Sequence, residues 1–223
     1  MTSPDTQQAL IDRLVADATP VRRLWPPAAR LALWAALLAA MLIAIAVAAG
    51  WPFGAASRAP SLPWELVCAV AAALLWAALA LRDAVPGRAT PRGARLAVAL
   101  LALAPLAFWL GDPSTQGELT LHAFIERGLP CTRLTIGLAL LPCLTLLWAV
   151  HRGAPLSPRR AAAWSGGAGF LSGYLLTRIF CPMTDPAHLL IWHVLPVVGG
   201  IVVCTGLGSW WLARWRRRRP QLG

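Results

Sequence analysis

Six long apolar runs dominate this chain and limit what it can fold into. They cover residues 31–50, 64–81, 96–110, 134–150, 161–180 and 189–212. About 20 helical residues are needed to cross roughly 30 Å of membrane hydrocarbon. Only 13% of the residues are charged, whereas a soluble domain carries about 25%. The sequence therefore predicts an all-α integral membrane protein, built as a bundle of six transmembrane helices.

The basic residues indicate how these helices are oriented. All 20 are arginines, and most of them stand in short connections beside the apolar runs. Sixteen fall on the side that holds both termini, and four fall on the opposite side. Because positive charge is retained on the cytoplasmic side, we expect both termini to be cytoplasmic. This placement also accounts for the net charge of +11 without direct binding of nucleic acid.

The N-terminal segment is the one sizeable part outside the predicted bundle. We divide the chain into a cytoplasmic segment, a transmembrane domain and a basic cytoplasmic tail, at residues 1–30, 31–215 and 216–223. The first segment predicts a short amphipathic helix that ends before Pro20, and Arg22 and Arg23 then lie close to the bilayer. Its apolar residues recur at the spacing of one helical face: Leu10, Ile11, Leu14 and Val15. This stripe fits the bilayer surface or a groove on a soluble partner equally well.

Two of the five cysteines stand at predicted outer ends of helices. Cys131 precedes the fourth apolar run and Cys181 follows the fifth. Two outer thiols at one level could form a disulfide, react as thiolates or bind a transition-metal ion. The other three lie inside apolar runs and are interpreted as packing residues: Cys68, Cys143 and Cys204.

The stretch CPMTDPAHLLIWHVLP, residues 181–196, gathers polar groups that are rare elsewhere in the chain. The spacing of its histidines matches no standard zinc motif. Thr184 or Asp185 is expected to cap the last helix, with Pro186 in the first turn. The candidate metal ligands beside the two cysteines are Asp185, His188, His193 and, from the preceding outer loop, His122.

The other polar and ionisable residues of the chain argue against a catalytic or transport function. The sequence contains no Ser–His–Asp signature, no phosphate-binding glycine loop and no paired carboxylates within the apolar runs. Glu65 and Arg178 stand only at the edges of these runs, so we expect neither an enzyme nor a transporter. Gly169 and Gly173 form a GxxxG pair, which favours close packing within one bundle over a homodimer contact.

The C-terminal half resembles a known family. HRGAPLSPRRAAAWSGGAGFLSGY, followed by CPMTDPAHLLIWHVLPVVGG, resembles the NrsF-like membrane anti-sigma factors, and PVRRLWPP is similar to the segment that precedes their first span. This resemblance implies a bacterial inner-membrane protein that inhibits an extracytoplasmic-function sigma factor. It implies that the apolar stripe of residues 10–15 contacts the sigma factor. It further implies that Cys131 and Cys181 sense metal or oxidative stress at the periplasmic face.

Two other functions would use the same residues. A small membrane redox protein, or a metal or haem carrier, would employ the outer cysteines and histidines. A structural membrane subunit would instead pack its N-terminal helix on another membrane protein. Co-purification with a sigma factor separates the anti-sigma factor from both of these alternatives.

Overall fold

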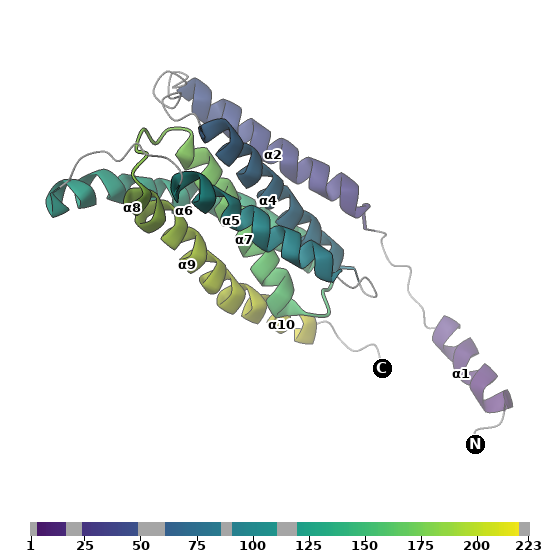
Figure 1. The fold of residues 1–223 in the computed structure, drawn as a ribbon. Coiled ribbons are helices and arrows are strands. Elements are labelled where there is room, and N and C mark those ends of the chain that lie inside the picture. Colours follow the sequence, from purple (N-terminus) through teal and green to yellow (C-terminus); the bar gives the residue numbers. More distant parts are fainter. Residues whose placement is uncertain (1–3, 17–23, 49–60, 86–90, 111–119, 219–223) are drawn as a thin grey trace.

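The structure is a computed structural model that describes residues 4–16, 24–48, 61–85, 91–110 and 120–218, and every regular element in these ranges is helical (Figure 1). A short helix, α1 (Pro4–Ala16), precedes five long ones: α2 (Pro27–Ala48), α4 (Leu62–Asp83), α5 (Arg92–Leu110), α6 (Leu121–His151) and α7 (Pro158–Arg178). The last helical stretch consists of α8 (Pro186–Leu189), η1 (Leu190–Val194), α9 (Leu195–Val203), η2 (Cys204–Gly208) and α10 (Ser209–Arg218), where η marks a π-helical turn. The all-α fold is thus confirmed.

Four helical stretches are long and apolar enough to cross a membrane. They are Pro27–Ala48, Leu62–Asp83, Leu121–His151 and Pro186–Arg214, which correspond to the first, second, fourth and sixth predicted spans. Helices α5 and α7, which correspond to the third and fifth, are not among them. Within the described residues, length and composition therefore support four of the six predicted spans.

The modest hydropathy of α7 follows from its position at the centre of the bundle. It packs against α4 and α6 and against the last helical stretch. All but two of its residues from Ala161 to Arg178 are buried. A helix that is enclosed by other helices presents little surface to lipid, so glycine, serine and arginine are tolerated along it.

Glycines on α7 allow α6 to approach closely. A Cβ atom on Gly169 would lie 2.4 Å from Cβ of Cys143, and one on Gly173 would lie 2.3 Å from the Thr135 carbonyl oxygen. The interpretation of this GxxxG pair as packing within one bundle is confirmed. The same packing brings Sγ of Cys143 within 3.2 Å of Sγ of Cys204, a proximity that their positions in the sequence did not indicate.

Helix α6 is longer than the predicted fourth span. Thr120 caps its first turn by accepting a hydrogen bond from the backbone nitrogen of Ala123. The helix then continues through Pro130 and Pro142 for 31 residues, a length of roughly 46 Å. The segment before the predicted fourth span, which holds His122, is therefore the first part of α6, and the helix carries Cys131 into the bundle.

The last helical stretch is widened at η1 because Pro196 follows it. Proline has no N–H, so the carbonyl of Trp192 loses its normal helical partner. Thr132 of α6 supplies a replacement by donating its hydroxyl to this carbonyl over 3.1 Å. Gly128 makes room for the contact, since a Cβ there would lie 2.1 Å from the Trp192 ring. The first turns of the last helical stretch are thereby held against the first half of α6.

Candidate metal and signal-sensing site

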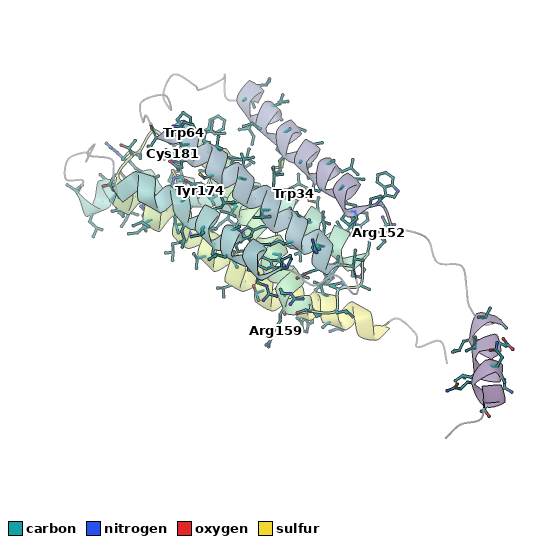
Figure 2. All side chains as sticks on the ribbon, turned by 45° about the vertical axis from the view of Figure 1, so that its right-hand side comes forward. Trp34, Trp64, Arg152, Arg159, Tyr174 and Cys181 are labelled. Atoms are coloured by element: carbon teal, nitrogen blue, oxygen red, sulfur yellow. The ribbon has the colours of Figure 1, made fainter. Side chains whose placement is uncertain are left out.

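Two cysteines and two histidines converge at one end of the bundle. Cys131 comes from α6, Cys181 from the connection after α7, His188 from α8 and His193 from η1. Their possible ligand atoms all lie within 4.8 Å of one another. Figure 2 shows Cys181 at the opposite end of the bundle from Arg152. The expectation that Cys131 and Cys181 lie at one level is confirmed.

The distances between these atoms suit a tetrahedral metal ion. Sγ of Cys131 lies 3.8 Å from Sγ of Cys181, which in turn lies 3.6 Å from Nε2 of His188. Thiolates at about 2.3 Å and imidazoles at about 2.05 Å from a tetrahedral ion would be separated by roughly 3.8 Å (sulfur to sulfur) and 3.6 Å (sulfur to nitrogen). Two thiolates and two imidazoles also form a usual ligand set for Zn²⁺. The four side chains therefore fit a metal ion of this class.

Burial of unpaired imidazoles gives a second indication of a ligand. His188 and His193 are fully buried, Cys181 is 4% exposed and Cys131 is half-buried. Three of their four ring nitrogens have no hydrogen-bond partner within the described ranges: both nitrogens of His193 and Nδ1 of His188. Because buried polar atoms are costly unless they are bonded, this arrangement favours a bound group that uses them.

Cys181 has the properties of a thiolate ligand. The thiol of Cys131 donates a hydrogen bond to its sulfur, which lowers the pKa of Cys181, and the nearby imidazoles of His188 and His193 lower that pKa further. Burial acts in the opposite direction but does not prevail. A thiolate is the form that binds metal ions and reacts with oxidants.

Two predicted ligands lie outside this cluster. Asp185 is the N-cap of α8, where its carboxylate accepts a hydrogen bond from the His188 backbone nitrogen over 2.8 Å. The predicted cap is thus confirmed, and the carboxylate orients the backbone of a neighbouring ligand. His122 is exposed on the first turn of α6 and pairs with Glu126 over 3.1 Å. It is not part of the cluster.

A buried ion pair supports the connection that carries Cys181. Arg178 donates through Nε to Oε1 of Glu65 over 2.9 Å, and through Nη1 to the carbonyls of Cys181 and Met183. Tyr174 also donates its hydroxyl to Glu65 Oε1. The sequence analysis placed Glu65 and Arg178 at the edges of apolar runs but did not predict their ion pair. A lone carboxylate in an apolar run requires a partner, and this requirement could have predicted the pair.

Aromatic rings enclose the histidines. Phe124 of α6 lies edge-on to His188 with ring centroids 6.4 Å apart, and it packs on Trp192 at 5.6 Å. The Tyr174 ring lies edge-on to His193 at 6.0 Å. These rings exclude water from the imidazoles, and an electrostatic change at the cluster is therefore weakly screened.

The predicted sigma-binding residues lie far along the chain from this cluster, on α1. Every side chain from Thr6 to Ala16 is exposed, and Figure 1 shows α1 standing apart from the bundle. The apolar stripe is between 51 and 68% exposed and consists of Leu10, Ile11, Leu14 and Val15. Arg22 and Arg23 lie outside the described residues.

The geometry defines an all-helical protein, compatible with a membrane, that has a cysteine–histidine cluster at one end and an exposed amphipathic helix near its N-terminus. Residues 14–217 match the model of the NrsF family, described as "Negative regulator of sigma F". The chain therefore belongs to the NrsF family, whose description is that of a negative regulator of a sigma factor. No curated protein and no solved structure matches the chain.

Proposed function

We propose that the protein is a membrane-bound anti-sigma factor that holds an extracytoplasmic-function sigma factor at the inner membrane. Its cytoplasmic N-terminus binds the sigma factor, and a periplasmic metal or oxidative signal at Cys131 and Cys181 releases it. Membership of the NrsF family is the observation that carries the regulatory part of this proposal. The role is regulatory rather than enzymatic.

The exposed stripe on α1 supports binding of the sigma factor through the N-terminus. Apolar side chains exposed along one helical face, as these four are, are the usual means by which a short helix docks in a hydrophobic groove. The opposite face carries Asp12, which accepts a hydrogen bond from Gln8 over 3.0 Å. An acidic polar face is poorly suited to anionic lipid, so a protein groove is the better partner.

The arrangement of the helices supports six crossings. α7 packs against α4, α6 and the last helical stretch, and α5 packs against α4, so that both run along the bundle with the apolar stretches (Figure 1). The 21 residues of α7 span about 31 Å, which is the thickness of the hydrocarbon core. With both termini cytoplasmic by the distribution of arginine, the cysteine–histidine cluster faces the periplasm.

The cluster supplies the sensor in this proposal. A soft or borderline divalent ion, such as Cd²⁺ or Zn²⁺, binds the two thiolates together with His188 and His193. An oxidant instead joins the two sulfurs, which lie 3.8 Å apart. Either event pulls α6 and the α7–α8 connection together, and the bundle then shifts to a state in which the N-terminus releases its partner.

The test is co-purification of the sigma factor with the full-length protein from native membranes. We expect Leu10→Ser/Leu14→Ser to lose the sigma factor and to switch on its target genes without any stress. Ala9→Ser/Ala16→Ser, which places the same hydroxyls on the opposite face of α1, is the matched control and should keep it. If the stripe variant retains the sigma factor as the control does, the proposed binding surface is wrong.

A metal carrier is the second candidate, and the three buried imidazole nitrogens without a hydrogen-bond partner favour it equally. A carrier would bind and exchange the ion without any change in sigma-factor binding. Measuring both quantities on one preparation separates the two functions.

A further inference from the structure

A pocket of about 430 Å³ opens between the first half of α2 and the last turns of α6. Arg30 from α2 and Arg152, which caps α6, line one end of it. Two helical turns further in, about 10 Å by helix geometry, its walls are Leu37 and Thr145. Figure 2 shows Arg152 beside the start of α2, at the end of the bundle away from Cys181. The pocket thus has a cationic end, and the rest of its lining is largely apolar.

The guanidinium group of Arg30 is only partly satisfied by the protein. Its Nη1 donates to the carbonyl of Ala149 over 3.1 Å. Its Nε and Nη2 are buried, and no described residue forms a hydrogen bond with them. A cation in this position is costly unless an anion accompanies it.

The second arginine adds charge without neutralising the first. The guanidinium carbon of Arg152 lies 4.9 Å from the centre of the Trp148 ring, and both residues line the pocket. Neither Arg30 nor Arg152 takes part in an ion pair within the described part of the chain, and no acidic side chain lines the pocket. Two guanidinium groups therefore face one site that holds no counter-charge from these residues.

We propose that this pocket binds one anionic phospholipid of the cytoplasmic leaflet. The phosphate lies between Arg30 and Arg152, and an acyl chain follows Leu33, Trp34 and Leu37 toward the middle of the bilayer. Guanidinium groups suit phosphate because they donate two parallel hydrogen bonds, and basic pockets between transmembrane helices on the cytoplasmic side are typical headgroup sites. The leaflet assigned here rests on the membrane orientation given under Proposed function.

Lipid in this pocket would also fix the base of the N-terminal segment. Leu24 and Trp25, which connect α1 to α2, line the same pocket. An occupied pocket would hold these two residues against α6 and limit where α1 can reach. The bound lipid is thereby a structural partner of the segment that we propose for sigma-factor binding.

The experiment is native mass spectrometry of the purified full-length protein in detergent, titrated with dioleoyl phosphatidylglycerol or with phosphatidylcholine of the same chains. We expect the wild type to bind phosphatidylglycerol at least about tenfold more tightly, and Arg30→Gln/Arg152→Gln to lose this preference. Arg214→Gln is the matched control, because Arg214 also lies over a tryptophan, Trp210, at 5.3 Å but lines no part of this pocket. It should bind as the wild type does.

Equal binding of the two lipids by the wild type, or an unchanged preference in the double variant, would overturn the proposal. Displacement of phosphatidylglycerol by millimolar inorganic phosphate would also overturn it, by reassigning the site to a free anion. If the double variant does not fold, Arg152→Gln alone decides the matter, because Arg152 is exposed and its loss leaves the bundle intact. None of these measurements involves the sigma factor, so failure here is distinct from failure of the proposed function.

Discussion

Arg178 and Glu65 form a buried ion pair that ties the candidate sensor to the centre of the bundle. Nε of Arg178 lies 2.9 Å from Oε1 of Glu65, and the two side chains are 3% and 0% exposed. The same guanidinium donates to the carbonyls of Cys181 and Met183. The position of one cysteine of the cluster therefore depends on a carboxylate of α4.

Glu65→Leu should destabilise the protein by about 3–5 kcal/mol, because it leaves the Arg178 guanidinium buried and without its counter-charge. Glu65→Leu/Arg178→Met should recover part of this loss, since no unpaired charge remains. Unfolding by denaturant in detergent micelles measures both. A double variant that is less stable than Glu65→Leu would show that the ion pair is not the cause. His122→Gln, at the exposed pair with Glu126, should leave stability unchanged.

Metal affinity should depend on all four members of the cluster. Alanine at Cys131, Cys181, His188 or His193 should each weaken Cd²⁺ binding by at least about tenfold, because each removes one ligand of the set. Isothermal titration of the purified protein gives the affinities. His122→Gln and Cys68→Ala, at positions outside the cluster, should bind as the wild type does. Wild-type affinity in His193→Ala would exclude that residue as a ligand.

The reactivity of Cys181 should extend to lower pH than that of an ordinary thiol. The hydrogen bond donated by Cys131 stabilises the thiolate and lowers the pKa of Cys181, so in metal-free protein alkylation persists as the pH falls below the ordinary thiol range. Cys131→Ala removes the donor and should move the midpoint of the pH–rate profile upward, whereas Cys131→Ser keeps a donor and should move it less. Mass spectrometry of Cys181 modified by iodoacetamide follows the reaction. Identical midpoints in the wild type and Cys131→Ala would contradict this account.

Gly173 should tolerate no side chain. In Gly173→Ala the new methyl group would lie 2.3 Å from the Thr135 carbonyl oxygen, so α6 and α7 must separate, at a cost of about 1–3 kcal/mol. Because Thr135 stands one helical turn from Cys131, Cd²⁺ affinity should fall as well. Gly199→Ala is the control, since nothing lies within 4 Å of a Cβ there and alanine favours the helix. Equal stability of the two variants would show that the close approach of α6 to α7 is not required.

Local patterns were sufficient to predict most helices of this chain. The length of the apolar runs predicted helices at α2, α4 and the last helical stretch, and Asp185 followed by Pro186 predicted the cap of α8. The predicted fourth span began at residue 134, more than three turns after the start of α6 at Leu121, because the prediction followed the apolar run whereas the helix begins before it and continues through Pro130. A proline inside a membrane helix is tolerated where neighbouring side chains satisfy the freed carbonyls.

The site could be predicted only in part, since its decisive contacts join residues distant in the chain. Cys131 and Cys181 could be assigned to one end of the bundle by topology alone. Whether His188 and His193 join them depends on the turn after α7 and on the π turn that Pro196 imposes. The contact between Arg178 and Glu65 spans 113 residues, and no local pattern encodes it. His122 and Asp185 were grouped with these residues by their places in the sequence, and the fold leaves both outside the cluster.

The central claim is that metal binding at the cysteine–histidine cluster controls whether the protein binds the sigma factor. Its most direct test is a titration of the purified complex of full-length protein and sigma factor with Cd²⁺, following release of the sigma factor by fluorescence anisotropy. We predict release at the Cd²⁺ concentration that fills the wild-type cluster, and retention of the sigma factor by Cys131→Ala/Cys181→Ala across the same range. Release from both proteins at the same concentration, or a wild-type complex that stays intact with its cluster filled, would contradict the account.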